Sequence, residues 1–275
     1  MRDALMAERW RRWGQTKEQR AADPVAATGL LNRVGVATLF PASPEVPNLY
    51  HAYMGDPEAK TEAEWDSPAG HVYGWRWELG RAEAGFYCVL VRKRPTWVSW
   101  GLLPAILRLR GEMRTPDELF DLAVISPAAY RIAQALDASG GVLSTGDLRR
   151  EAGFPTGKEQ RAAYLKAVEE LDSRLLLARV FLPDETDMSH ALVATRYPEQ
   201  MEAAERMTRE EAYERFLRAY LPNAMFAAPV VLARHLGVPE GELREGLEHL
   251  VEEGLLTRQP IEGYKGDCYT WTGGA

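Results

Sequence analysis

The sequence lacks the features that mark a membrane protein or a disulfide-stapled protein. No apolar run reaches the roughly 18–20 residues that span a bilayer, and the stretch "MFAAPVVLA" is interrupted by Pro229. The amino terminus "MRDALMAERWRRW" carries charges where a signal peptide needs an apolar core. The only cysteines, Cys88 and Cys268, form no CxxC pair. These absences predict a cytoplasmic protein without membrane contact, whose cysteines serve as small apolar residues.

The motifs of the common enzyme classes are also missing. The chain has no GxxxxGK[ST], GxGxxG, GxSxG or HExxH motif, which would mark a phosphate-binding loop, a dinucleotide site, a nucleophile or a zinc site. Its histidines show no ligand spacing, and we expect neither a metal nor a cofactor. The histidines are His51, His71, His190, His235 and His249.

Charge is distributed unevenly along the chain. The formal net charge of −7 disfavours a protein that coats nucleic acid indiscriminately. Residues 81–114, however, hold seven basic side chains against two acidic ones, a net +5. Residues 199–262 hold seven Arg against thirteen Glu, a net −6. The basic segment therefore favours a nucleic-acid partner, and the acidic one internal packing or a protein partner.

One short phrase occurs twice, as "LRREAGFP" at 148–155 and as "LARHLGVP" at 232–239. Each copy follows a helix with a strong start signal, Ser126–Pro127 in the first case and the Thr208–Glu211 capping box in the second. The glycine of each copy permits the left-handed turn that ends a helix. The phrase therefore predicts the second helix of a repeated unit.

The segments after the two phrases agree with this interpretation. Amphipathic helices follow, and each is succeeded by two extended segments that read as a hairpin. Three helices and a β-hairpin make a winged helix. The residues expected to face inward on the third helices are Tyr164, Leu165, Val168 and Leu171 in the first copy and Leu243, Leu247 and Leu250 in the second.

The predicted fold class is mainly α with small β-hairpins, built from tandem winged-helix (helix-turn-helix) domains. We place a middle winged helix at residues 119–198 and a C-terminal one at residues 199–275. For residues 1–118 we predict a third, degenerate unit of the same kind. It includes a Pro-rich connector over 41–70 that lacks clear periodicity. After the connector we expect a helix over "RAEAGFYCVLVRK", a strand at "TWVS" and a helix over "LLPAILRLRG".

Seven cations are the predicted phosphate contacts, because Lys and Arg track a nucleic-acid backbone. In "VRKRPTWVSW" three of them come shortly before two tryptophans, a residue type that more often belongs to a core. The others lie at the start of the middle unit's third helix and on the helix before it. The seven are Arg92, Lys93, Arg94, Arg149, Arg150, Lys158 and Arg161.

The third helix of the last unit carries glutamates that a duplex would repel, so the middle unit is expected to be the better DNA reader. For both units the alternative is a merely solvated charged face. The glutamates are Glu240, Glu242, Glu245, Glu248, Glu252 and Glu253.

Together with the tandem winged helices, the stretch "YGWRWELGRAEAGFYCVLVRKRPTWVSWGLLPAILRLRG" resembles the winged-helix DNA glycosylases of the crosslink-repair (AlkZ/YcaQ) type, from about Pro24 onward. The resemblance implies binding of damaged or distorted DNA and, in active members, cleavage of the N-glycosidic bond. Those members hold the attacking water with a Gln-x-Gln or Gln-x-Asp motif after the first helix. Here "GVATLFPA" puts Thr38 and Phe40 at those positions. Neither residue suits that chemistry, and no catalytic role is transferred to them.

The resulting hypothesis is a DNA-binding, non-catalytic or divergent relative of these glycosylases that acts in DNA repair or damage recognition. One alternative is an active glycosylase whose catalytic carboxylate has moved to Glu64 or Asp66, beside Trp65 in "EAEWDSPAG". A plain polar loop explains that stretch more simply. The other alternative is a protein-interaction scaffold or transcriptional regulator, supported by the acidic C-terminal domain.

Overall fold

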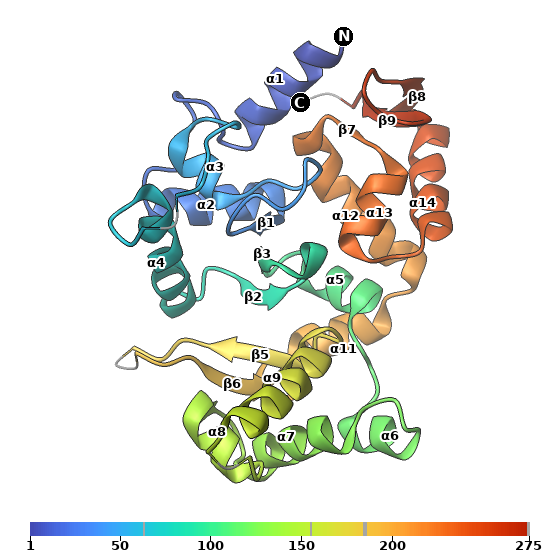
Figure 1. The fold of residues 1–275 in the computed structure, drawn as a ribbon. Helices are drawn as coiled ribbons and strands as arrows, with labels where there is room; N and C mark the ends of the chain where they lie inside the picture. The colour runs from blue at the N-terminus through green and yellow to red at the C-terminus, as the bar shows by residue number, and fades with distance from the viewer. Residues whose placement is uncertain (63, 155, 184–185, 274–275) are drawn as a thin grey trace.

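The computed structural model describes residues 1–62, 64–154, 156–183 and 186–273, and it is mainly helical with three small antiparallel sheets (Figure 1). One order of elements occurs three times along the chain: a helix, a short strand, two helices and two further strands. In each sheet the third strand lies between the first and the second. No helix in the described part of the chain is long and apolar enough to cross a membrane.

The first repeat begins at α2 (Pro24–Val34), which Asp23 caps and Gly35, at φ 79°, ends. The Asp23 cap and the positive φ of Gly35 are local signals that start and end a helix. The remaining elements of the repeat are β1 (Val36–Thr38), α3 (Leu49–Met54), α4 (Pro68–Arg81), β2 (Phe86–Val89) and β3 (Pro95–Val98). A short 3-10 helix, η1 (Val91–Lys93), joins β2 to β3.

One prediction for this repeat is wrong. The helix expected over residues 81–93 contains strand β2 instead, because the aromatic-rich "FYCV" pairs with β3 in antiparallel register. The connector over 41–70, whose sequence shows no clear periodicity, contains helical structure. It holds α3 and the start of α4, whose first turns are capped by the side chains of Asn48 and Ser67.

The middle repeat confirms the predicted start signals. Ser126 caps the first helix as predicted, and Gly153 stands at φ 73° after the second helix, which the Ser144 side chain caps. Leu165 was expected to face inward, but its helix turns it outward and it is 53% exposed. Pro155 lies outside the described residues. The elements are α7 (Pro127–Ala138), β4 (Leu143–Ser144), α8 (Thr145–Glu151), α9 (Lys158–Asp172), β5 (Leu177–Val180) and β6 (Ser189–Leu192).

The third repeat matches its prediction closely. The Thr208–Glu211 capping box is formed, and Gly237 takes a left-handed conformation at φ 71°. The three inward leucines of its third helix are fully buried. The elements are α12 (Arg209–Ala224), β7 (Phe226–Ala227), α13 (Pro229–Leu236), α14 (Glu240–Glu252), β8 (Leu256–Pro260) and β9 (Asp267–Trp271).

The hydrophobic residues form two main cores. The first and third repeats share one continuous core, whereas most of the buried apolar residues of the middle repeat form a core of their own. Helix α5 (Leu103–Arg110) packs against α11 (Pro198–Arg206) and α12, so it lies between the repeats in Figure 1. Two short helices, α6 (Pro116–Asp121) and α10 (Val193–Arg196), flank the middle repeat.

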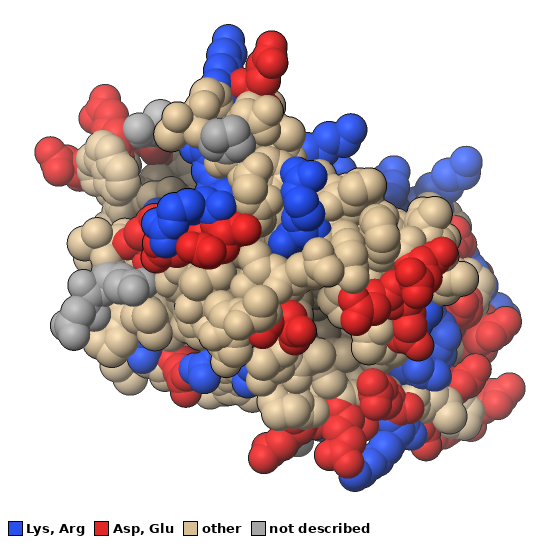
Figure 2. Space-filling view, turned by 90° about the horizontal axis from the view of Figure 1, so that it is seen from below, with Lys and Arg blue, Asp and Glu red and all other residues tan. Residues whose placement is uncertain are grey.

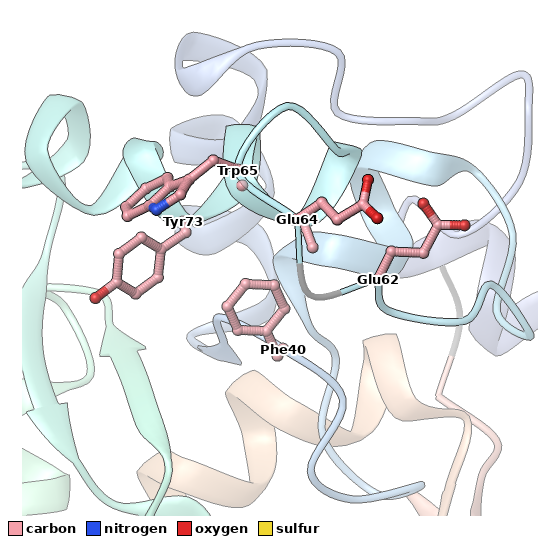
Figure 3. A pocket seen from close by; sticks show the side chains of 7 residues that line it. Phe40, Glu62, Glu64, Trp65 and Tyr73 are labelled. Carbon is pink, nitrogen blue, oxygen red and sulfur yellow. The ribbon is translucent and has the colours of Figure 1, made fainter.

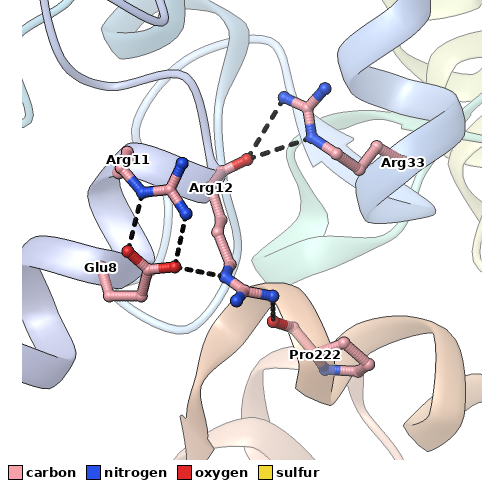
Figure 4. Close-up of polar contacts among 5 residues, drawn as sticks. All are labelled: Glu8, Arg11, Arg12, Arg33 and Pro222. Carbon is pink, nitrogen blue, oxygen red and sulfur yellow. Dashed lines mark hydrogen bonds and ion pairs between the residues drawn. The ribbon is translucent and has the colours of Figure 1, made fainter. Parts of the chain in front are cut away.

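Helix α1 (Arg2–Arg12) precedes the repeats and is fastened to the third one (Figure 4). Arg12 donates a hydrogen bond to the carbonyl of Pro222 at 2.8 Å, and Arg33 donates to the carbonyl of Arg12. Arg11 and Arg12 both donate to Glu8, and these bonds lower the pKa of the Glu8 carboxyl to about 2. The amino-terminal helix is therefore held beside residues more than two hundred positions away.

Candidate nucleic-acid interface

A cavity of about 810 Å³ lies between the first and third repeats, and we call it the basic cavity. Five cationic side chains from four separate segments line it, and its described lining includes no carboxylate. Cations that line one cavity repel one another, so the site favours an anionic ligand. The cations are Arg2 of α1, Arg92 and Lys93 of η1, Arg234 of α13 and Lys265 of the β8–β9 turn.

Two of these cations stand on a strained backbone. Arg92 and Lys93 have φ values of 48° and 58°, in the left-handed region that costs a non-glycine residue about 1–2 kcal/mol. Arg92 donates a hydrogen bond to the carbonyl of Ala42 at 3.0 Å, while Lys93 pairs with Glu169 at 3.1 Å and stays 80% exposed. Strain of this kind concentrates at functional sites. It places two adjacent cations at the tip of the β2–β3 hairpin.

His235 lines the basic cavity and pairs with a hydroxyl. His235 Nδ1 lies 2.5 Å from the hydroxyl of Ser43, which also accepts a hydrogen bond from the Glu45 amide. Burial, with the nearby Arg92 and Arg234, lowers the pKa of His235. The ring is therefore neutral near pH 7, and the positive charge of the cavity comes from its lysines and arginines.

Two adjoining cavities of about 240 and 470 Å³ are lined by residues of the first repeat, and we call them together the aromatic cavity. Phe40, Glu62 and Tyr73 line both of them, and Trp65 lines the smaller one. Figure 3 shows the Trp65 and Tyr73 rings on one side, with Glu62 and the carboxylate of Glu64 on the other side of Phe40. The Trp65 and Tyr73 rings meet edge to face, with centroids 5.6 Å apart.

The positions that correspond to the glycosylase motif are apolar or structural here. Thr38 is fully buried and its hydroxyl donates to the carbonyl of Phe40 at 2.8 Å, so it serves the fold. Phe40 forms part of the aromatic cavity wall. Of the two candidate carboxylates, Glu64 lines the smaller cavity, whereas the described lining does not include Asp66. Glu62, two positions before Glu64 in the same acidic stretch, lines both cavities.

The four predicted cations of the middle repeat do not line the cavities described above. Arg149 donates to the carbonyl of Gly157, and Arg150 forms ion pairs with two neighbouring carboxylates of its own segment. Lys158 and Arg161 are exposed at the start of α9. Figure 2 shows the molecule from below, the side of the middle repeat, with basic side chains interspersed among acidic ones. Arg92 and Lys93, which were predicted as phosphate contacts together with these four cations, line the basic cavity.

Three cations of the basic cavity were absent from the predicted set. Arg234 and Lys265 belong to the third repeat, whose net negative charge gave no indication of a cationic site. Arg2 lies outside the repeats altogether. Within the third repeat, arginines compensate much of the acidic face of α14. The ion pairs are Arg244–Glu240, Arg209–Glu242, Arg258–Glu248 and Arg218–Glu253.

The described residues include no group of three or more His, Cys, Asp or Glu side chains that could hold a metal ion. Both cysteines are buried, as the sequence predicts. Burial raises the pKa of the Cys88 thiol to about 12 and that of Cys268 to about 11. Neither thiol is therefore a nucleophile near neutral pH.

Comparison with known proteins gives a family and a related fold. A family model described as AlkZ related matches residues 23–234. Among solved structures, the DNA glycosylase AlkZ of Streptomyces sahachiroi has a similar fold, with a TM-score of 0.60 and 15% sequence identity. The match covers 98% of this chain and 69% of that one. No curated protein matches the sequence.

Proposed function

The chain belongs to the AlkZ-related family, and on this basis we propose that it binds damaged or distorted duplex DNA in DNA repair without cleaving the glycosidic bond. The family and the basic cavity support DNA as the partner. Phe40 and the buried Thr38, at the positions where active members hold their water, support the absence of catalysis. A cytoplasmic location stays part of this proposal.

We propose that each repeat is a winged-helix unit, with the domains at residues 1–118, 119–198 and 199–275. The recurring order of elements and the placement of the third strand between the first and second support this assignment. In these terms η1 is the wing tip of the first unit, and the β8–β9 turn is that of the third. Both wing tips then contribute cations to the basic cavity.

The observation that carries the proposal is the convergence of five cations without a lining carboxylate. Phosphate groups match such a site, since their charge supplies most of the affinity in non-specific DNA binding. Under this proposal a strand lies across the wing tips of the first and third units, with its phosphates near Arg92, Arg234 and Lys265. Arg94 and the middle-repeat residues Arg149, Arg150, Lys158 and Arg161 are proposed as additional contacts along the duplex.

Equilibrium binding to plain, nicked and branched duplexes, titrated with salt, tests this function. We expect affinity to fall steeply with salt, and Arg234→Ala or Lys265→Ala each to reduce the slope of log K against log salt by about 1. Arg206→Ala is the matched control, because Arg206 is exposed and paired with Glu202 on α11. Duplex affinity that does not depend on salt concentration would contradict the proposal. So would a slope of log K against log salt that is the same in Arg234→Ala as in the wild-type protein.

Charge-reversal variants show whether the basic cavity or the middle repeat contributes more to duplex affinity. If the basic cavity dominates, Arg92→Glu abolishes duplex binding whereas Arg150→Glu has little effect, because Asp147 and Glu151 already neutralise Arg150. The opposite result would show that the middle unit reads the duplex and would favour the interpretation based on sequence.

The second candidate function is an active glycosylase with a relocated carboxylate, which the position of Glu64 in the aromatic cavity favours. Incubation with alkylated duplex, followed by alkali and detection of strand breaks, decides between the two. We expect no base release. Release that disappears in Glu64→Gln or Asp66→Asn would establish catalysis. A scaffold or regulator that binds a protein through the acidic third unit would instead leave every duplex unbound.

A further inference from the structure

The basic cavity holds more positive charge than the internal phosphates of one DNA strand require. Each internal phosphodiester carries one negative charge, whereas five cationic side chains line this single cavity of about 810 Å³. The proposed path of a strand past Arg92, Arg234 and Lys265 uses three of them. The other two are Arg2 and Lys93. A phosphate group with a higher charge would match the cavity better.

Arg2 reaches the basic cavity from outside the three repeats. It is an exposed residue at the start of α1, and this end of the helix lies near the β8–β9 hairpin (Figure 1). A Cβ at Gly263 would lie 3.6 Å from the central carbon of the Arg2 guanidinium, so the guanidinium packs against the β8–β9 turn. The buried hydrogen bonds of Arg9 fasten the same helix to the third repeat. The fold therefore holds the charge of Arg2 at the cavity.

His235 offers the cavity a hydrogen-bond donor without a charge. Its Nδ1 lies 2.5 Å from the Ser43 hydroxyl, whose oxygen accepts a hydrogen bond from the amide of Glu45. That hydroxyl has its own proton to donate to Nδ1, which places the proton of the neutral ring on Nε2. Because His235 lines the cavity, its N–H group can serve a phosphate oxygen beside the cations.

These groups match a phosphomonoester, the kind of phosphate that stands at the end of a DNA strand. A phosphomonoester carries about 1.5–2 negative charges near pH 7 and has three terminal oxygens. An internal phosphodiester has less charge and fewer terminal oxygens. Arginine binds such oxygens in a bidentate geometry. Arg2 and His235, which the path of a continuous strand does not use, therefore favour the terminal phosphate.

We propose that the basic cavity binds a phosphomonoester at the end of a DNA strand, such as the phosphate at a nick, and that Arg2 and the Nε2–H group of His235 recognise it. The inference rests on the proposed DNA binding and adds the class of DNA site that is bound. It concerns recognition alone, since no bond forms or breaks. Arg94, which follows the two cations of η1, lines the aromatic cavity and is not part of this site.

Binding to duplexes closed by a hairpin loop at both ends tests this inference, because a single nick then supplies the only strand ends. The nick carries either a phosphate or a hydroxyl at its 5′ end, and in a second pair of duplexes at its 3′ end. We expect the phosphate to raise affinity about tenfold over the hydroxyl at one of the two ends, as one charge-assisted contact supplies. Equal affinities for phosphate and hydroxyl at both ends would refute the terminal-phosphate site.

Variants of the two recognition residues test their roles. Arg2→Ala should bring the affinity ratio between phosphate and hydroxyl close to one. His235→Phe keeps a flat ring without an N–H group and should lower the ratio, whereas His235→Gln keeps a donor and should retain more of it. Arg11→Ala is the matched control and should keep the full ratio, because Arg11 lies on the same helix, pairs with Glu8 and is outside the described lining. An equal loss of affinity for the phosphate and hydroxyl forms in Arg2→Ala would refute its role.

Thymidine 5′-monophosphate separates a strand end from a free phosphomonoester. It should displace the phosphorylated duplex only at concentrations far above that of the duplex, because it lacks the neighbouring phosphates of a strand. Competition as strong as that of the duplex itself would assign the cavity to a small phosphate compound and overturn the strand-end site.

The outcomes also separate this inference from the proposed function. Salt-dependent duplex binding without a preference for the phosphorylated nick would refute the inference and leave the proposed function standing. Binding of thymidine 5′-monophosphate without binding of any duplex would refute the proposed function, and the strand-end site with it.

Discussion

The buried contact that fastens α1 to the third repeat predicts a large loss of stability on the substitution Arg9→Met. Arg9 is fully buried and donates hydrogen bonds to the carbonyls of Ala224 and Phe226, both at 2.6 Å, and of Pro44 at 3.0 Å. Its guanidinium also lies 3.6 Å from the carboxylate of Glu45, which is itself fully buried. The substitution therefore leaves a buried carboxylate without its cation and three carbonyls without their donor.

The size of the expected stability loss follows from the groups that Arg9 contacts. Removing one member of a buried ion pair costs about 3–5 kcal/mol, and a buried carbonyl that loses its donor costs about 1–3 kcal/mol. Because relaxation lets these costs overlap, we expect a loss of about 4 kcal/mol, a large part of the 5–15 kcal/mol typical of a folded domain. The double variant Arg9→Met with Glu45→Gln removes the stranded charge and should recover about 2 kcal/mol.

Urea unfolding can measure this loss of stability for the shared core of the first and third repeats, because the middle repeat contains no tryptophan. Seven of the eight tryptophans lie within the first hundred residues, and none lies between residues 119 and 198. Tryptophan fluorescence therefore follows the shared core of the first and third repeats, whereas far-UV circular dichroism also follows the middle repeat. The fluorescence midpoint should fall in Arg9→Met, and the dichroism of the middle repeat should be retained at that urea concentration.

The control is Arg11→Ala, which removes an exposed pair with Glu8 on the outer side of the same helix. It should leave the midpoint unchanged. If Arg9→Met shifts the midpoint no further than Arg11→Ala does, then α1 is not anchored by the buried pair. Full additivity of Arg9→Met and Glu45→Gln would likewise show that the two side chains do not interact.

Two further predictions concern pH and backbone strain. Burial, with a smaller contribution from Arg179, lowers the pKa of His190 to about 4. Below its ordinary pKa of about 6.5 the unfolded chain binds a proton that the folded chain does not, so stability is lost as pH falls from about 6.5 to 4. The loss is about 3 kcal/mol, visible by circular dichroism of the middle repeat and abolished in His190→Gln. Lys93→Gly relieves the left-handed backbone and should raise the free energy of unfolding by up to about 1 kcal/mol while weakening duplex binding; a gain in affinity would contradict the role of this residue.

Local signals in the sequence were sufficient for most helices. Ser126 and Thr208 cap the helices that they predict, and Gly153 and Gly237 take the left-handed conformations that end theirs. These signals act within a few residues, because a cap or a positive φ depends on neighbouring backbone groups. The helical content and the small hairpins of the second and third repeats could therefore be derived from the sequence.

Strand β2 shows where such local reasoning fails. Strand β2 follows α4 after four residues, and nothing between β2 and β3 has the composition of a turn. The chain reverses there through Arg92 and Lys93 in a left-handed conformation that usually calls for glycine or asparagine. Pairing with β3, which depends on contacts beyond the local sequence, decides the strand.

The sequence by itself determined most helices of the second and third repeats with their ends, and that no familiar catalytic motif is present. Only the tertiary structure decided which charges act together. Arg234 and Lys265 belong to an acidic segment, yet they meet Arg92 in the basic cavity while many of the glutamates of α14 pair with arginines elsewhere. Capping and periodicity are properties of neighbouring residues. Electrostatic potential at a site sums over all charges close in space, whatever their separation along the chain.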